Sequence, residues 1–290
     1  MKKWIKRLLL LLMLLLWSCN FPLLQEEQPT VTQEQGDTLV PTTELSPTRP
    51  ASQPVPSEKV SPALTEELPQ RPAEAIVILE PGPGSRLTSP LRVAGMADPT
   101  FEQTLIVRIV LDDGTVLTEV PTTIKADLGE RGPYEVEIPL NVQDECMALI
   151  QVYDVSARDG GIIHLSSVGV TLAGNGEAQI NPGVVHPEAI TIHLPGRGAE
   201  IRGGVVHVEG IGIASFEGTL VVEVYDAEGA LVGEQPLIVD APEMGQPGAF
   251  SVEVSYSVDS EGPGRIVVID PLPAFDGIGH IASVEVFLGP

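Results

Sequence analysis

The stretch GMADPTFEQTL (residues 95–105) returns later in the chain as GIGIASFEGTL (residues 210–220). Each copy begins with a glycine, continues to a Phe-Glu pair and ends on Thr-Leu, where an apolar run opens. The two copies lie about 115 residues apart, and nearly the same spacing relates Asp159-Gly160 to Asp276-Gly277. The chain therefore contains one module twice, and each module has roughly 100 residues.

Inside each module, apolar and polar residues alternate with a period of two, which is typical of strands that bury one face. In the run Leu105–Ile109 the odd positions are apolar and Arg108 faces outward, while Phe250–Tyr256 alternates large apolar residues with Ser and Glu. Gly, Pro and Asp separate such runs, and Asp112-Asp113-Gly114 predicts a hairpin turn. The pattern predicts an all-β protein with two tandem immunoglobulin-like β-sandwich domains of about seven strands each.

Composition divides the chain into five segments, the first of which is a leader over residues 1–18. Residues 19–72 are rich in Pro, Thr, Glu and Gln and show no sustained period, so we expect a disordered tether there. The first immunoglobulin-like domain is predicted over residues 73–174 and the second over residues 188–290. Residues 175–187, rich in Gly, Asn and Pro, are the expected linker between them.

The leader has the order of a signal peptide, with basic residues first, then an apolar run and then a small residue. The apolar run, Leu8–Trp17, is too short to span a bilayer as a stable helix. Leu16-Trp17-Ser18-Cys19 resembles the bacterial lipobox, and this resemblance implies cleavage after Ser18 and lipidation of Cys19. We therefore expect an exported protein that is lipid-anchored to the bacterial cell membrane on its extracytoplasmic side. An ordinary signal peptide and a retained anchor are the alternatives.

The chain is strongly acidic, with 16 basic and 40 acidic residues and a net charge of −24. Four of the basic residues and none of the acidic ones precede Cys19, so the rest of the chain has 12 basic against 40 acidic residues, a net charge of −28. Binding to nucleic-acid phosphates needs clustered Lys and Arg, so the composition excludes a nucleic-acid-binding protein. Cys146, the other cysteine, opens an apolar run and is expected to be an inert, half-buried thiol.

No catalytic signature is present in the sequence. It has no Gly-x-Ser-x-Gly elbow, no His-Glu-x-x-His and no phosphate-binding glycine-rich loop. Five histidines occur, none at metal-ligand spacing: His164, His186, His193, His207 and His280. His193 and His207 could meet across neighbouring strands, although surface positions are favoured for both. We expect no catalytic residue, no cofactor and no metal centre.

A calcium site and a sugar-binding surface are two further possibilities for the domains. Asp154, Ser156 and Asp159 could supply calcium ligands, but Asp-Gly is also a common turn, which is the favoured interpretation. Both tryptophans lie in the leader, which argues against the aromatic stacking typical of sugar-binding sandwiches. Phe101 and Phe216 are expected to plug the cores at the start of a strand rather than to serve as ligand platforms.

Four features that occur in both copies resemble one bacterial family. They are Pro-Gly at residues 81–82 and 195–196, a strand-ending glycine at 95 and 210, Phe-Glu at 101–102 and 216–217, and Asp-Gly at 159–160 and 276–277. Together they resemble the immunoglobulin-like domain of bacterial spore germination, over roughly residues 75–173 and 188–289. That family usually accompanies a GerMN domain in exported or cell-envelope proteins, and the sequence has no GerMN-like segment. The resemblance implies a fold and a location, without a germination role.

These features together predict a non-catalytic cell-envelope lipoprotein. Its tandem immunoglobulin-like domains are expected to bind another envelope protein through exposed sheet edges and end loops. The membrane is the second partner, through the lipid on Cys19. A cell-wall or polysaccharide adhesion module, with or without calcium, is the alternative.

Overall fold

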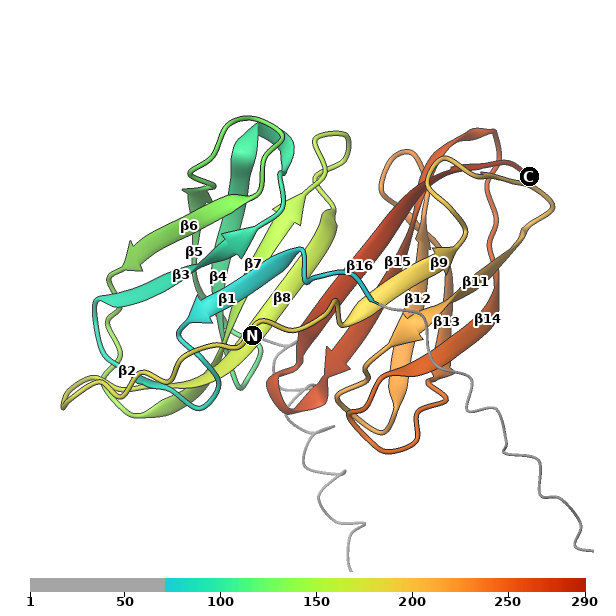
Figure 1. The fold of residues 1–290 in the computed structure, drawn as a ribbon. Coiled ribbons are helices and arrows are strands. Elements are labelled where there is room, and N and C mark those ends of the chain that lie inside the picture. The colour runs from blue at the N-terminus through green and yellow to red at the C-terminus, as the bar shows by residue number, and fades with distance from the viewer. Residues whose placement is uncertain (1–70) are drawn as a thin grey trace, which may run out of the picture. The chain divides into compact units, whose positions relative to one another are not determined.

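The computed structural model describes residues 71–290, which form β-strands joined by turns and two short 3-10 segments (Figure 1). Cys19 and the rest of the leader, together with the expected tether up to residue 70, lie outside the described residues. None of the helices within residues 71–290 is long and apolar enough to cross a membrane. The predicted all-β class is confirmed for this part of the chain.

The first copy of the module folds as two sheets that pack on one core. One sheet has the order β1-β3-β6, from β1 (Ile76–Glu80), β3 (Leu91–Ala97) and β6 (Gly132–Ile138). The other strands run in the order β8-β7-β4-β5, with β4 (Thr104–Leu111), β5 (Val116–Thr123), β7 (Cys146–Val155) and β8 (Ile162–Leu172). The short β2 (Arg86–Leu87) pairs in parallel with β8, and a 3-10 turn, η1 (Phe101–Gln103), leads into β4.

The second copy repeats this arrangement. Its smaller sheet has the order β14-β11-β9, from β9 (Ile190–Leu194), β11 (Val205–Gly212) and β14 (Gly248–Ser255). The other strands run in the order β13-β12-β15-β16, with β12 (Thr219–Tyr225), β13 (Leu231–Ile238), β15 (Gly262–Leu272) and β16 (Gly277–Leu288). The short β10 (Glu200–Ile201) pairs in parallel with β16, and η2 (Pro273–Phe275) lies between β15 and β16.

Each sandwich has its own apolar core, and the alternation in the sequence determines which residues enter it. The inward positions predicted for β4 are all fully buried: Leu105, Val107 and Ile109. Tyr134 fills the first core, and its hydroxyl donates to the carbonyl oxygen of Val77 at 3.0 Å. Phe250 is 2% exposed at the equivalent place of the second core. Full burial of such a side chain stabilises the fold by about 2 kcal/mol.

The two sandwiches share one sheet. β8 and β16 pair antiparallel, with His280 opposite Ser166 and Ile281 opposite Leu165. The joined sheet has the order β13-β12-β15-β16-β8-β7-β4-β5 (Figure 1). Equivalent strands follow in the same order on either side of the β8–β16 pair, which relates the two copies by an approximate two-fold axis. The sequence predicted two tandem domains, but not that their last strands pair.

A third apolar cluster lies on the face of the shared sheet that points away from the two cores. It consists of Tyr153 of β7, Leu165 of β8, Val267 of β15 and Ile281 of β16. These residues alternate along their strands with core residues, so their side chains project to the opposite face. Their exposed fractions are 4%, 0%, 4% and 3%. The two copies are therefore joined by a packed interface rather than by a free joint.

The predicted linker lies against the first sandwich. The Gly82 N–H donates to the carbonyl oxygen of Asn181 at 2.7 Å. A Cβ added at Gly82 would lie 2.2 Å from the carbonyl oxygen of Pro182, so only glycine permits this close approach. The chain thus enters the second copy from a segment that is already hydrogen-bonded to the first.

Candidate functional site at the junction of the two sandwiches

Four titratable side chains converge where the two sandwiches meet. Glu74 and His164 come from the first copy, and Glu188 and His280 from the second. One potential ligand atom from each lies within 4.8 Å of the other three. We call these four residues the junction cluster. Among residues 71–290 it is the one group of this kind built from His, Cys, Asp and Glu.

The repeat explains the composition of the junction cluster. Glu74 precedes β1 and Glu188 precedes β9, and each is followed by Ala-Ile. His164 lies in β8 and His280 lies in β16, at equivalent places of the two copies. The approximate two-fold axis therefore brings two copies of one Glu–His pair together.

Backbone hydrogen bonds hold the two glutamates side by side. The Glu74 N–H donates to the carbonyl oxygen of His186 at 3.2 Å, and the Glu188 N–H donates to the carbonyl oxygen of Pro72 at 2.8 Å. The segments before β1 and β9 thus form a short antiparallel ribbon. This ribbon fixes the backbone positions from which both glutamate side chains extend.

His280 lies between the two carboxylates. Its Nε2 atom is 2.8 Å from Glu188 Oε1, and its Nδ1 atom is 3.4 Å from Glu74 Oε1. Ser166 Oγ donates to Glu74 Oε1 at 2.7 Å. The Ala75 N–H donates to Glu188 Oε2 at 2.9 Å. These bonds from Ser166 and Ala75 orient both carboxylates toward the centre of the cluster.

His164 has a buried ring nitrogen without a hydrogen-bond partner among the described residues. Its Nε2 atom lies 3.4 Å from Glu188 Oε1 without forming a hydrogen bond. Its ring meets the His280 ring edge-on, with the ring centres 5.1 Å apart and an interplanar angle of 89°. A buried polar atom left unpaired costs about 1–3 kcal/mol, so this nitrogen calls for an explanation.

Burial dominates the protonation of the junction cluster. It raises the pKa of Glu74 and that of Glu188 above the ordinary carboxyl value, although His280 opposes the first shift and His164 the second. Burial lowers the pKa of His164 to about 4 and also lowers the pKa of His280. Both imidazoles are therefore largely neutral at pH 7, and each keeps one ring nitrogen with a free lone pair.

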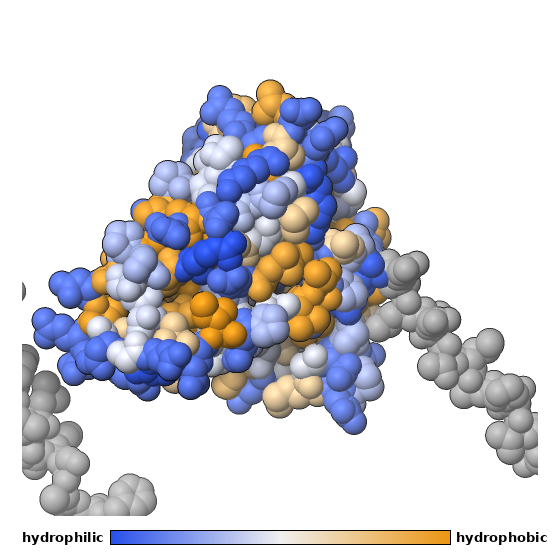
Figure 2. Space-filling model, turned by 60° about the vertical axis from the view of Figure 1, so that its left-hand side comes forward, coloured by the Kyte–Doolittle hydropathy of each residue, from blue (hydrophilic) through white to orange (hydrophobic). Residues whose placement is uncertain are grey.

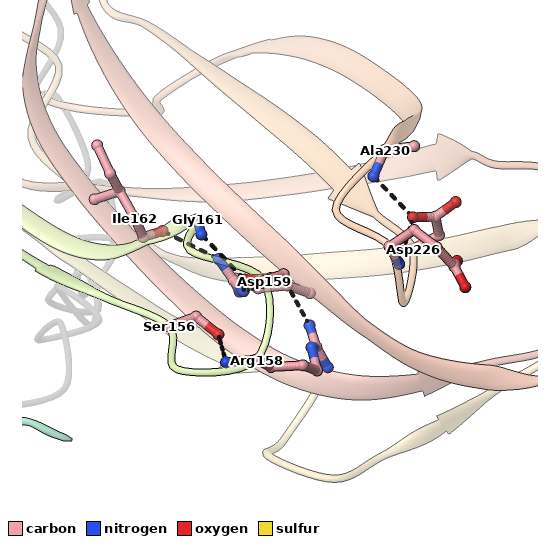
Figure 3. Close-up of polar contacts among 9 residues, drawn as sticks. Ser156, Arg158, Asp159, Gly161, Ile162, Asp226 and Ala230 are labelled. Atoms are coloured by element: carbon pink, nitrogen blue, oxygen red, sulfur yellow. Dashed lines mark hydrogen bonds and ion pairs between the residues drawn. The ribbon is translucent and has the colours of Figure 1, made fainter.

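The loop between β7 and β8 is the one that the sequence offered as a calcium site. Arginine side chains of the protein contact its Asp159 carboxylate (Figure 3). Arg265 of β15 contacts both carboxylate oxygens of Asp159, and Arg158 Nη2 lies 3.0 Å from Asp159 Oδ2. The Gly161 N–H donates to Asp159 Oδ1 at 3.1 Å. Burial opposes ionisation of Asp159, but these hydrogen bonds outweigh it and hold the pKa of its carboxyl well below the usual range.

The other two calcium candidates have separate surroundings. Ser156 Oγ accepts a hydrogen bond from the Arg158 N–H at 3.2 Å, and the Ser156 carbonyl oxygen accepts one from the Gly160 N–H at 2.8 Å. Gly160 has a φ of 71°, as a tight turn requires. Asp154 lies on β7 opposite His164, and burial raises its pKa to about 6. This geometry favours the interpretation of the loop as a turn that an ion pair ties to the second sandwich.

The spacing of histidines along the sequence does not reveal the junction cluster. His164 and His280 come together only through the β8–β16 pairing. The available signal is the repeat itself, which places a Glu before the first strand and a His in the last strand of both copies.

His193 and His207 do not form the pair considered from the sequence. His207 lies outside the β9–β11 pairing, which begins at Glu209.

The expectation that Phe101 and Phe216 plug the cores is wrong, because these residues are 61% and 45% exposed. In the first copy φ is positive at Glu102 and Gln103, so the turn directs Phe101 outward. Gln103 enters the interior instead, and its side-chain nitrogen donates to the carbonyl oxygen of Asp127 at 2.9 Å. The two phenylalanines thus lie on equivalent turns. More than half of the surface of Phe101 and nearly half of that of Phe216 is exposed.

Apolar side chains gather in separate patches on the face shown in Figure 2, with charged and polar side chains between them. Across residues 71–290, the large apolar side chains that are more than 60% exposed are Phe101, Leu128, Val184, Val185, Ile238 and Met244. Single exposed apolar residues are ordinary on a protein surface, whereas a large contiguous apolar patch marks a surface of interaction.

Comparisons with known proteins address the fold. The sequence model of the immunoglobulin-like domain of bacterial spore germination matches the chain twice, over residues 75–161 and 189–273. No curated protein matches the chain. The two matched segments confirm the tandem immunoglobulin-like repeat predicted from the sequence.

Several solved structures share a weak likeness. Dimeric latent PorU from Porphyromonas gingivalis is 13% identical. The match covers 75% of this chain and 20% of that chain, with a TM-score of 0.28. The periplasmic chaperone SfaE is 13% identical. The match covers 73% of this chain and 99% of that chain, with a TM-score of 0.22. The N-terminal Ig1-2 module of the Drosophila receptor protein tyrosine phosphatase DLAR is 12% identical. The match covers 76% of this chain and 100% of that chain, with a TM-score of 0.21.

Proposed function

Because this chain belongs to the family of immunoglobulin-like domains of bacterial spore germination, we propose that it is a non-catalytic cell-envelope lipoprotein whose two domains bind another envelope protein. Lipid on Cys19 holds the domains at the extracytoplasmic side of the bacterial cell membrane. The lipobox resemblance of residues 16–19 supports this anchor, and these residues lie outside the described part of the chain. Immunoglobulin-like domains are widespread as binding modules of exported and cell-surface proteins.

The pair of exposed phenylalanines supports the binding proposal most directly. Phe101 and Phe216 occupy equivalent turns in the two copies and expose 61% and 45% of their residue surface. Aromatic side chains are enriched at protein interfaces, where they anchor into pockets of the partner. The chain after Cys19 carries a net charge of −28, so the surface that meets these turns is expected to combine apolar pockets with basic side chains.

Site-specific photocrosslinking in cells tests this proposal. A photoreactive phenylalanine analogue replaces Phe101 or Phe216 in the full chain. Val116, which is 50% exposed and lies at the opposite end of the β4–β5 hairpin from the Phe101 turn, serves as the matched control position. We expect one discrete crosslinked envelope protein from the two phenylalanine positions and none from the control. The double variant Phe101→Ser, Phe216→Ser is expected to lose capture of that same protein.

Two outcomes contradict the proposal. Equal crosslinking from all three positions indicates random contact rather than a binding surface. Retention of the protein on purified cell wall or polysaccharide, with no discrete protein crosslink, favours the adhesion alternative. If that retention is abolished by a chelator, calcium assists it.

A further inference from the structure

We propose that the junction cluster binds one divalent transition-metal ion, and that zinc is the ion whose chemistry it matches best. Glu74, His164, Glu188 and His280 each supply one ligand atom. Four protein ligands leave no open position for a substrate, which is typical of structural rather than catalytic zinc sites. The ion then ties the first copy to the second, because each copy contributes one Glu and one His.

The ligand types select the class of metal. Imidazole nitrogens suit zinc, copper, iron and nickel, whereas all-oxygen ligand sets suit calcium and magnesium. The cluster has two imidazoles, two carboxylates and no thiolate. A thiolate-preferring ion such as Cu(I) is therefore a poor match, and zinc accepts this set in tetrahedral geometry.

The distances are close to those of a tetrahedral site. With metal–ligand bonds of about 2.0–2.1 Å, neighbouring ligand atoms of such a site lie about 3.4 Å apart. His164 Nε2 lies 3.4 Å from Glu188 Oε1, and His280 Nδ1 lies 3.4 Å from Glu74 Oε1. All four ligand atoms are within 4.8 Å of one another. A pair at the 4.8 Å limit closes by about 1.4 Å to reach the tetrahedral spacing, which is about 0.7 Å for each ligand atom.

The unpaired nitrogen of His164 points to the same conclusion. Within residues 71–290 its Nε2 atom is buried and makes no hydrogen bond, although Glu188 Oε1 is 3.4 Å away. Coordination of a metal ion supplies the missing partner. A hydrogen-bonded cluster without metal leaves this nitrogen unsatisfied, at a cost of about 1–3 kcal/mol.

Outer contacts already orient the proposed ligands. Ser166 Oγ donates to Glu74 Oε1 at 2.7 Å, and the Ala75 N–H donates to Glu188 Oε2 at 2.9 Å. Bonds of this kind are typical of metal centres, where they hold each carboxylate in its coordinating orientation. In Glu188 the hydrogen bond from the Ala75 N–H occupies Oε2, so Oε1 is the oxygen that binds the metal, in place of its 2.8 Å hydrogen bond with His280 Nε2.

The charge of the site also favours a cation. Glu74 and Glu188 are 9% and 6% exposed and lie side by side. Arg71 and Arg131 lie nearby, but their guanidinium groups donate to the backbone carbonyl oxygens of Glu188 and Glu74, each at 3.0 Å, rather than to either carboxylate. A divalent ion compensates both buried carboxylates at once.

Ions can reach the cluster from solvent. A hollow of about 580 Å³ is lined by Glu74 and His280, among others, and a second hollow of about 460 Å³ is lined by His164 and Glu188. The cluster thus borders open space on both sides of the junction, while its ligand atoms remain largely buried. An entry path is one of the requirements for a metal site that fills after folding.

Metal titration of the purified full chain tests the proposal. The protein is stripped with a chelator and then titrated with Co²⁺, whose visible d–d bands report tetrahedral coordination, and the zinc content is measured by mass spectrometry. We expect one ion per chain and a melting temperature that rises with zinc. The variants His164→Gln and Glu188→Gln are each expected to bind at least about tenfold more weakly, and Ser166→Ala about tenfold more weakly.

The exposed histidine His207 provides the matched control, since His207→Gln leaves the cluster intact and is expected to bind like the wild type. The competing arrangement is a metal-free latch in which His280 Nε2 is hydrogen-bonded to Glu188 Oε1 while its Nδ1 faces Glu74 Oε1 at 3.4 Å. That latch is established, and the proposal overturned, if the folded wild type takes up no more zinc or Co²⁺ than His164→Gln. If the cluster variants fail to fold, zinc X-ray absorption of the wild type decides: imidazole scattering with four ligands supports the site, and an all-oxygen shell refutes it.

Discussion

Replacing Arg265 by Met is expected to destabilise the protein by about 3 kcal/mol. Arg265 belongs to the second sandwich, and its guanidinium contacts both carboxylate oxygens of Asp159 in the first. Both side chains are 3% exposed. Met keeps the aliphatic part of the side chain and removes the charge, so the variant isolates the ion pair from the packing around it.

The magnitude follows from what remains after the substitution. Removing one partner of a buried ion pair costs about 3–5 kcal/mol, because the other charge is left buried. Asp159 keeps Arg158, whose Nη2 atom is 3.0 Å away, and the N–H of Gly161 at 3.1 Å. Arg265 also has a buried Nε atom without a partner among the described residues, and this unsatisfied donor disappears with the substitution. Both effects place the expected loss at the lower end of the range.

Urea denaturation of the full chain, followed by circular dichroism, measures this loss in a double-mutant cycle. The cycle combines Arg265→Met with Asp159→Asn. Because both variants break the same pair, the double variant is expected to lose little more than either single one. Arg197→Met is the matched control, since Arg197 is 84% exposed in its ion pair with Glu285, and we expect a change within about 0.5 kcal/mol. A loss below about 1 kcal/mol for Arg265→Met, or a coupling energy near zero, would refute the reasoning.

Four further predictions concern the pH dependence, the junction, the modules and the anchor. The depressed pKa of Asp159 means that its ion pair stabilises the fold above the ordinary carboxyl pKa of about 4 and is lost as the pH falls further. The difference in unfolding free energy between wild type and Asp159→Asn should therefore be constant from pH 7 to about 5 and shrink below about 4; a difference that grows on acidification contradicts this sign. Leu165→Ala, at a fully buried position of the third apolar cluster, should cost about 3 kcal/mol by urea denaturation, and a loss under about 1 kcal/mol would show that the cluster is loosely packed. Fragments 73–174 and 187–290 should each melt cooperatively by circular dichroism, at lower temperature than the full chain because each exposes its side of the junction; if neither melts cooperatively, the division into two modules is wrong. Cys19→Ser should abolish lipid labelling and release the protein from membranes, and unchanged membrane retention would exclude the lipid anchor.

The strands and turns of this protein could be predicted from its sequence, because their causes are local. Alternation along Leu105–Ile109 places every second side chain on one face, and burial of that face leaves one register. The hairpin predicted at Asp112-Asp113-Gly114 is confirmed, since β4 ends at Leu111 and Gly114 has a φ of 80°. Glycine adopts that conformation without steric cost, so this turn needs no tertiary contact to specify it.

The placement of Phe101 could not be predicted in the same way. An apolar residue just before a strand is usually buried, but the left-handed backbone at Glu102 and Gln103 reverses which side chain enters the core. Gln103 is accepted there because the carbonyl oxygens of Asp127 and Glu130, at 2.9 and 3.0 Å, satisfy its side-chain nitrogen. Those acceptors come from a loop more than twenty residues away, roughly beyond the reach of any local pattern.

The sequence by itself determined the two-fold repeat, the all-β class and the acidic charge, since these depend on residue order and composition alone. The junction was decided only by the tertiary structure. His164 and His280 are separated by just over half of the described chain, and they meet because β8 and β16 are edge strands whose unpaired N–H and C=O groups can bond each other. Backbone hydrogen-bonding groups are nearly the same in every residue, so no side-chain pattern predicts that pairing. The approximate two-fold axis it creates is what places a second Glu and a second His opposite the first.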